Sequence, residues 1–149
     1  MSVKYQTAIL HSILFCMDTN TESGPGRVIG IGGVFFKSAD PAGTNAWYAE
    51  NLGVAAGADG YAFRWRALDE PEVERGTTWC VFKRESTYFD PSPAPFMINY
   101  IVDDLDAILA KLTAKGVRMD PKQDSEYGRF AWIYDSDGNK IELWEPPRT

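Results

Sequence analysis

One acidic residue near the C-terminus has a setting in which it could do chemistry. Glu142 lies within Lys140–Trp144, a short stretch in which polar and apolar residues alternate as they do in a half-buried strand. Its apolar members would face a core, and Glu142 would lie on the other face beside Trp144. A carboxylate in such a place could act as a general base in proton transfer. The alternative is a structural role, in which Glu142 takes part in a hydrogen bond with Asn99 or Tyr127.

A tight turn and an aromatic run precede this strand. The run Phe130–Tyr134 is rich in residue types that favour strands. The turn Asp135–Asn139 contains Gly138, and glycine supplies the positive φ that a tight turn needs. Pro146 and Pro147 follow the strand, and proline cannot donate to a ladder. The sequence therefore predicts a β-hairpin that presents Glu142 on one face.

The residues of this hairpin, DSDGNKIEL, resemble the closing hairpin of the vicinal oxygen chelate superfamily, which includes glyoxalases, bleomycin-resistance proteins and extradiol dioxygenases. In that family the pattern D-x-D-G-N-x-I-E-L marks the last strand, and its Glu is often a metal ligand. The resemblance covers about Val28–Pro146. It implies an α+β fold in which two tandem βαβββ modules form a curled mixed sheet around one cavity, with the helices outside.

Two halves of the chain also share one order of expected elements. Each half begins with an apolar strand, over residues 28–37 and 96–102, and continues past a capping Asp into a helix. Each helix stops at a Gly-Val pair that begins at Gly53 or Gly116. The matching spacing predicts a duplicated module, and chance recurrence of βα units is the alternative. In the first half, strands are expected near 61–67 and 77–83, with the acidic segment 69–76 as a solvated loop between them.

These patterns divide the chain into an extension and a domain. We expect an N-terminal extension and linker over residues 1–26 and one glyoxalase-like domain over residues 27–149, made of modules 27–90 and 95–147. The extension carries an apolar strip that is too short to span a bilayer. An exposed strip of this kind needs a surface to cover it, so we predict that it packs on the domain or on a second subunit, and that the protein is a homodimer. The residues of the strip are Ile9, Leu10, Ile13 and Leu14.

The resemblance implies metal-ligand positions on the first and last strands of each module. A first-strand ligand lies seven residues before the capping Asp, at Gly33 in the first module and Met97 in the second. The last strand of the first module offers only Cys80. Zinc, iron, nickel and manganese take imidazole or carboxylate donors at such positions. Glu142 is the only ligand-type residue retained, so we expect no metal site and no cofactor, and a divalent metal is the less favoured alternative.

The face that would hold a ligand is apolar and aromatic with few polar groups, which is the usual composition of a small-molecule site. By strand parity Met97 and Asn99 share this face in the second half, and Phe35 and Lys37 share it in the first. The resemblance places the loop around Gly128 at the mouth of the site. The predicted ligand-binding residues are Phe35, Lys37, Met97, Asn99, Tyr127, Arg129 and Trp144, and Glu142 is the catalytic candidate.

Composition narrows the class of partner. A formal net charge of −6 disfavours a nucleic-acid binder, which needs a basic surface to meet phosphates. No apolar run in the sequence has the length of a membrane span. The two cysteines, Cys16 and Cys80, have neither metal nor redox spacing, which favours a cytoplasmic protein. The expected partner is therefore a small organic molecule.

Two functions follow from the sequence and the resemblance. One is a glyoxalase-like enzyme in which Glu142 is the general base of an isomerase- or lyase-type proton transfer. The other is a non-catalytic protein that sequesters a drug or metabolite, as bleomycin-resistance relatives do.

Overall fold

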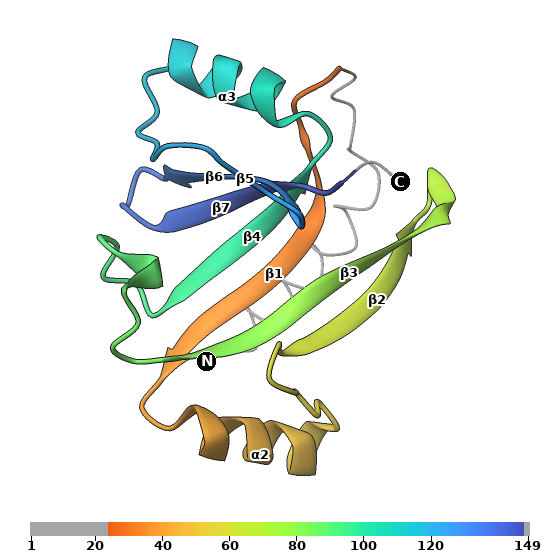
Figure 1. Ribbon diagram of the computed structural model, residues 1–149, viewed down its shortest axis with the longest axis vertical. Coiled ribbons are helices and arrows are strands. Elements are labelled where there is room, and N and C mark those ends of the chain that lie inside the picture. Colours follow the sequence, from red (N-terminus) through yellow and green to blue (C-terminus); the bar gives the residue numbers. More distant parts are fainter. Residues whose placement is uncertain (1–23, 148–149) are drawn as a thin grey trace, which may run out of the picture.

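A computed structural model describes residues 24–147 of the chain (Figure 1). The apolar strip of the extension lies outside the described residues, so the structure does not test the predictions made for it. The strands are β1 (Val28–Ser38), β2 (Tyr61–Ala67), β3 (Glu70–Lys83), β4 (Phe96–Val102), β5 (Gln123–Ser125), β6 (Gly128–Tyr134) and β7 (Lys140–Glu145). The helices are α2 (Pro41–Leu52) and α3 (Leu105–Ala114), with a short 3-10 helix, η2 (Thr87–Phe89).

The strands form one mixed seven-stranded sheet in the order β2-β3-β1-β4-β7-β6-β5. At its centre β1 and β4 run antiparallel, and each has a parallel partner on its other side, β3 beside β1 and β7 beside β4. The sheet curls without closing, and the two helices lie outside it at opposite ends (Figure 1). The α+β fold predicted from the sequence is confirmed. Within the described residues the first half has three strands and the second half four, and Gly57 and Gly60 form an isolated bridge outside the sheet.

Both helices begin at the predicted caps. Oδ1 of Asp40 accepts a hydrogen bond of 3.0 Å from the N–H of Gly43, and Oδ1 of Asp104 accepts one of 2.9 Å from the N–H of Ala107. These bonds satisfy backbone donors that have no partner within the first helical turn. Gly53 ends α2 with a φ of +70°, which glycine adopts without steric cost.

The acidic segment 69–76, predicted to be a solvated loop, is instead the first half of β3. The turn between β2 and β3 is confined to Leu68 and Asp69. Charges that look solvated in the sequence form ion pairs: Arg64 and Arg66 on β2 both pair with Glu74 on β3, and Arg75 pairs with Glu70 within β3. Cross-strand pairs of opposite charge stabilise a ladder, so the prediction of a loop was wrong.

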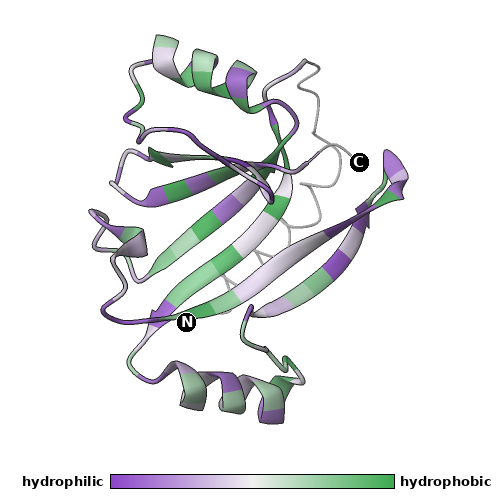
Figure 2. Ribbon diagram, in the orientation of Figure 1, coloured by the Kyte–Doolittle hydropathy of each residue, from purple (hydrophilic) through white to green (hydrophobic). Residues whose placement is uncertain are grey.

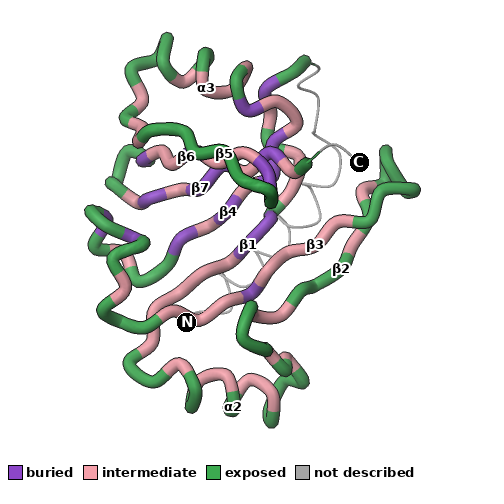
Figure 3. Tube along the Cα trace, in the orientation of Figure 1, coloured by how far each residue is buried: buried purple, intermediate pink, exposed green. Residues whose placement is uncertain are grey.

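The two faces of the sheet differ in what covers them. Hydrophobic and hydrophilic positions alternate along the strands (Figure 2). On the outer face of the second half, Val102, Ala131 and Leu143 are buried against Leu105 at the start of α3. On the outer face of the first half, Phe36 and Trp79 of the sheet pack against Tyr48 of α2, with ring centroids 4.6 to 6.1 Å apart. Buried positions concentrate on β4 and β7, whereas β2 is exposed at its edge of the sheet (Figure 3).

Neither helix between residues 24 and 147 has the length and hydropathy that crossing a lipid bilayer requires.

Candidate functional site

Glu142 lies on the inner face of the sheet, where it is 3% exposed and accepts three hydrogen bonds. Nδ2 of Asn99, on the neighbouring strand β4, donates to Oε1 over 2.6 Å. Nε1 of Trp132, on β6, donates to Oε2 over 2.8 Å, and the hydroxyl of Tyr88 donates to the same oxygen. We call these four residues the Glu142 cluster. The hydrogen bond between Glu142 and Asn99 was one of the two structural alternatives given by the sequence.

Tyr88 reaches this carboxylate from η2, which packs on the inner face. Its ring stacks on Phe82 with centroids 5.6 Å apart, and the neighbouring Phe89 is fully buried. Nζ of Lys140 donates to the backbone carbonyls of Tyr88 and Asp90, each over 3.0 Å. Burial and the adjacent Glu142 carboxylate raise the pKa of Tyr88 well above its ordinary value. The phenol therefore stays protonated at neutral pH and remains a donor.

Three other residues predicted to bind a ligand belong to the packed part of the same face. Met97 is fully buried, and its strand neighbour in the register is Phe35. Phe35 contacts Phe82 edge-on at 5.6 Å, and Nζ of Lys37 lies 5.0 Å from the ring centre of Phe89. Lys37 contacts η2 directly, and Phe35 contacts it through Phe82, whose ring packs on both Tyr88 and Phe89.

Residues of the closing hairpin take separate places. Nε1 of Trp144 donates to the backbone carbonyl of Tyr127 over 2.8 Å, while the Tyr127 side chain is 70% exposed. Arg129 pairs with Asp106 at 2.6 Å and with Glu145 at 3.2 Å, and so ties β6 to the first turn of α3. The structure therefore does not bring Arg129 or the Tyr127 ring to the Glu142 cluster.

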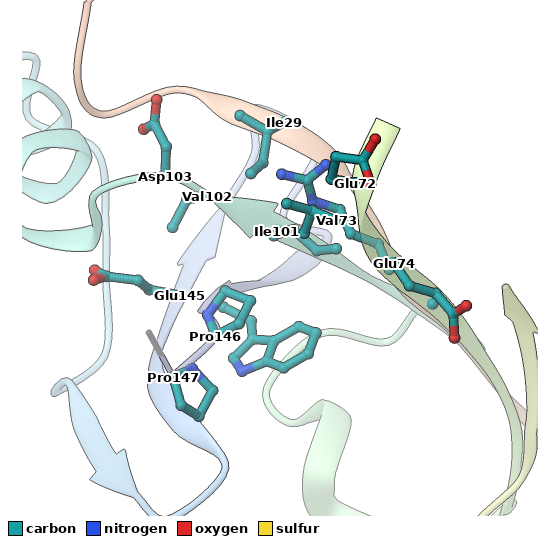
Figure 4. Close-up of a pocket in the computed structure, with 13 residues that line it drawn as sticks. Ile29, Glu72, Val73, Glu74, Ile101, Val102, Asp103, Glu145, Pro146 and Pro147 are labelled. Atoms are coloured by element: carbon teal, nitrogen blue, oxygen red, sulfur yellow. The ribbon is translucent and has the colours of Figure 1, made fainter. Parts of the chain in front are cut away.

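A pocket of about 580 Å³ lies where the two halves of the sheet meet, at the end of β4 and β7. Ile29, Val73 and Ile101 lie across it from Pro146 and Pro147 (Figure 4). Among the residues predicted from the sequence, Trp144 lines this pocket. The remaining lining residues are Glu72, Glu74, Arg75, Gly76, Val102, Asp103 and Glu145.

The pocket and the Glu142 cluster are neighbours on the sheet. Ile101 pairs with Trp144 at the pocket, and Asn99 pairs with Glu142 two residues further along the same strands. Residues two apart on a strand share a face, so the pocket wall leads directly to the cluster. Gly32 permits this packing, because a Cβ there would lie 2.2 Å from Oδ1 of Asn99 and 3.0 Å from both Ile101 and Trp144.

Arg75 is one of the lining residues that were not predicted from the sequence. Its side chain is 12% exposed, its Nη2 pairs with Glu70, and its Nη1 is buried without a hydrogen-bond partner. The segment was predicted to be a solvated loop, although its glutamates alternate in E-P-E-V-E-R. That period of two is typical of a half-buried strand and could have identified β3 and the position of Arg75 on the face opposite the glutamates.

The donors at the family's metal positions do not fit a divalent metal. Gly33 has no side chain, and Met97 offers only a buried thioether. Cys80 pairs with Phe35 on the neighbouring parallel strand, in the same way that Glu142 pairs with Asn99. Burial raises the pKa of the Cys80 thiol, with a smaller contribution from Asp59, and this disfavours the thiolate that a metal would need. Both oxygens of Glu142 already accept bonds from N–H or O–H groups. Within residues 24–147 no three His, Cys, Asp or Glu side chains come together as a metal site would require.

Comparison with known proteins gives structural relatives only. No family model matches the sequence, and no curated protein matches it. Among solved structures, methylmalonyl-CoA epimerase from Mycobacterium tuberculosis is similar at 20% identity, with 87% of this chain and 95% of that chain covered and a TM-score of 0.54.

Two further structures extend this comparison. A variant of methylmalonyl-CoA epimerase from Streptomyces coelicolor, in complex with 2-nitronate-propionyl-CoA, is 15% identical, with 82% of this chain and all of that chain covered and a TM-score of 0.59. An NAD-dependent benzaldehyde dehydrogenase from Legionella pneumophila is 14% identical over 77% of this chain and 98% of that chain, with a TM-score of 0.50. Identities this low show the fold alone. Methylmalonyl-CoA epimerase is a vicinal oxygen chelate protein, and the chain therefore has the fold of the vicinal oxygen chelate superfamily, as its closing hairpin predicted.

Proposed function

We propose that this protein binds a small organic molecule in the pocket between the two halves of its sheet. The observation that carries the proposal is the pocket itself, with a volume of about 580 Å³ and walls from β1, β3, β4 and β7. Ligand sites of folded proteins have volumes of roughly 300 to 1,000 Å³ and largely apolar walls with a few polar groups. The aliphatic and aromatic lining residues provide such walls, and Arg75 provides a polar group.

The structural neighbours support a small organic ligand. Methylmalonyl-CoA epimerases of the same fold have been solved with methylmalonyl-CoA and with 2-nitronate-propionyl-CoA. Those ligands are organic acyl compounds. They support a small-molecule ligand for this fold, and the class of ligand for this chain is argued from its own residues.

A thermal-shift screen tests the binding function. A ligand that binds only the native state raises the melting temperature by mass action. We would screen small carbonyl, thioether and aromatic compounds against the wild type and against Val73→Trp, which fills the pocket from a residue that is 45% exposed. Leu52→Trp is the matched control, because Leu52 is exposed on α2 and does not line the pocket.

Compounds that bind in the pocket should shift the wild type and Leu52→Trp equally and lose their effect on Val73→Trp. Hits that shift Val73→Trp as strongly as the wild type would place the ligand elsewhere and remove the proposal.

Proton transfer by Glu142 is the second candidate function. The observation that favours it is the position of the carboxylate, one same-face step from Trp144 in the pocket wall. Glu142 would take a proton from a carbon next to a carbonyl group, leaving an enolate. Return of the proton to a different position completes an isomerisation, and expulsion of a leaving group completes a lyase reaction. Against this role, both carboxylate oxygens already accept hydrogen bonds, which is why binding is the first proposal.

A proton-exchange experiment in deuterium oxide distinguishes the enzymatic function from binding alone. An enzyme of this kind would exchange the carbon-bound proton of a bound carbonyl compound for deuterium, and Glu142→Gln would stop the exchange without abolishing binding. NMR of the ligand measures the exchange directly. If the wild type binds a carbonyl compound tightly and exchanges none of its protons, the enzymatic candidate is excluded for that compound class.

A further inference from the structure

The guanidinium of Arg75 is held in a fixed position at the pocket. Its Cζ lies 5.8 Å from the ring centre of Trp65, and its Nη2 pairs with Glu70. Trp65 is fixed in turn, because its Nε1 donates to Oγ1 of Thr77 over 2.9 Å. Thr77 donates to the carbonyl of Ile31 over 2.6 Å. An arginine held by stacking and by an ion pair loses little conformational freedom when it binds a further group.

One donor of this guanidinium is left unpaired. Nη1 of Arg75 is buried and has no hydrogen-bond partner, although the rest of the side chain is engaged. A buried donor without an acceptor has lost its hydrogen bonds to water and has formed none to the protein, so its burial raises the free energy of the folded state. An acceptor on a ligand would pair this donor, so the pocket favours a ligand that carries an oxygen acceptor at this point.

The charges of the pocket indicate which acceptor this is. Glu70 already neutralises Arg75, the single Lys or Arg among the lining residues. The acidic lining residues are Glu72, Glu74, Asp103 and Glu145. Glu74, Asp103 and Glu145 are themselves paired with arginines that do not line the pocket. A carboxylate on the ligand would therefore find no unpaired cation among the lining residues, and an ammonium group could not accept a bond from Nη1. A neutral carbonyl oxygen pairs the donor without adding charge.

The remaining walls fit an apolar body for the same molecule. Ile29, Val73 and Ile101 form one side, Pro146 and Pro147 lie opposite, and these residues present hydrocarbon surface (Figure 4). Burial of such surface against a flat aromatic or branched aliphatic group is favourable and needs no polar partner.

We propose that the ligand of this pocket is a neutral, largely apolar ketone, ester or amide whose carbonyl oxygen accepts a hydrogen bond from Nη1 of Arg75. This inference rests on the proposed binding function and names the class of molecule bound. Glu70 disfavours binding of anionic analogues in the pocket, because its carboxylate already neutralises the guanidinium of Arg75 in the unliganded protein.

A set of four probes of matched shape tests the proposal. Acetophenone carries the carbonyl, ethylbenzene replaces the carbonyl by a methylene group, and benzoate and benzylammonium carry opposite charges. NMR titrations of isotope-labelled protein, followed at the Trp144 indole signal, give a dissociation constant for each probe. Acetophenone should bind about tenfold more tightly than ethylbenzene, the difference expected for one buried hydrogen bond, and more tightly than either ion.

Two variants and a control locate the effect. In Arg75→Met the preference for acetophenone over ethylbenzene should disappear, while Arg84→Met, which removes an exposed arginine at the end of β3, should retain it. In Glu70→Gln the guanidinium is no longer neutralised, so benzoate should gain about tenfold in affinity over wild type. This gain of binding cannot result from a damaged fold.

The outcomes distinguish the two proposals. Equal binding of acetophenone and ethylbenzene in wild type, or tighter binding of benzoate or benzylammonium, would overturn the carbonyl assignment and leave the binding function intact. Failure of all four probes to perturb Trp144 at millimolar concentration would overturn both.

Discussion

Asn99 and Glu142 face each other on the parallel strands β4 and β7, with 2.6 Å between Nδ2 of the amide and Oε1 of the carboxylate. Each residue is 3% exposed. A buried carboxylate needs donors around it, because it has lost its hydration. The pair therefore links the two strands of the second half and fixes the carboxylate beside the pocket.

Asn99→Asp should destabilise the protein strongly and make its stability depend on pH. Two carboxyl groups would then face each other in a buried site, and only one could ionise, so the folded state would retain a proton that the unfolded state releases at neutral pH. Stability should therefore fall as pH rises, with a loss of about 3 kcal/mol or more at pH 7 and recovery below about pH 4. Urea unfolding measured across this pH range checks both effects.

Asn139→Asp is the matched control for this change. Nδ2 of Asn139 donates to Oδ2 of Asp135 over 2.8 Å in an exposed turn, so its replacement also brings two carboxylates together. Solvent screens that pair, and the loss should stay below about 1 kcal/mol. Equal losses in the two variants would contradict the role of burial.

Ionisation of Tyr134 should lower the free energy of unfolding as the pH rises above about 10. Tyr134 is 7% exposed, its hydroxyl donates to Oδ2 of Asp120 over 2.7 Å, and burial raises its pKa to about 12, assisted by that bond and by the Asp120 charge. An unfolded tyrosine ionises near pH 10. Since the folded pKa is the higher one, this contribution is complete below about pH 10 and is lost as pH rises through about 12.

Tyr134→Phe should therefore cost about 1 kcal/mol at pH 7 and flatten the decline of stability above pH 10. Tyr127→Phe, at a side chain in a residue that is 70% exposed, should change neither. Denaturant unfolding at several alkaline pH values, with phenolate absorbance as a second readout, gives the comparison. An unchanged alkaline decline in Tyr134→Phe would assign the effect to other groups.

Gly128→Ala, which adds a single methyl group, should lower the free energy of unfolding strongly. Gly128 has a φ of +118°, and a Cβ there would lie 2.4 Å from the backbone oxygen of Glu145 and 2.7 Å from Nε1 of Trp144. The strand pairing of β6 and β7 would have to shift, which should cost about 3 kcal/mol. Gly138→Ala shares a positive φ of +80° but has open space around the added methyl group, so about 1 kcal/mol is expected there. Thermal unfolding of the two variants measures the difference.

Local chemistry explains which parts of the fold could be predicted from the sequence. The caps at Asp40 and Asp104, the stop at Gly53 and the turn at Gly138 all depend on neighbouring residues, and the structure contains each of them. The closing hairpin was predicted for the same reason. The acidic segment 69–76 was predicted wrongly because its composition was weighed above its period of two, and because the partners of Glu74, Arg64 and Arg66, lie on another strand.

The site depended on contacts between distant residues and could be predicted only in part. Parity along β4 and β7 placed Asn99 and Glu142 on one face, and the structure pairs them. Tyr88 is 54 residues from Glu142 and reaches it from a short 3-10 helix that has no periodic signal. Arg75 enters the pocket because β3 extends further than its composition suggested.

A homodimer remains a prediction from the sequence. Its basis is the apolar strip that includes Ile13 and Leu14, which lie outside the described residues. Covering that strip on a second subunit would bury apolar surface. Sedimentation velocity at micromolar concentration should show a dimer for the wild type, and a monomer for Ile13→Asp combined with Leu14→Asp. A wild type that sediments only as a monomer would remove the prediction.

The protein should bind no stoichiometric divalent metal at the family's ligand positions. A stable divalent site takes at least three protein donors, and Glu142 is the only carboxylate or imidazole at the four family positions, beside Gly33, Met97 and Cys80. Its oxygens also accept bonds from Tyr88, Asn99 and Trp132, so a metal would have to displace those donors. Protein purified without a metal-chelating tag should contain well under one equivalent of zinc, nickel, manganese or iron by elemental analysis, and chelator treatment should leave ligand binding unchanged. Stoichiometric metal that is lost in Glu142→Gln would show that these donors rearrange, and would overturn both the assignment of Gly33 and Met97 to the family's ligand positions and the expectation of a metal-free site.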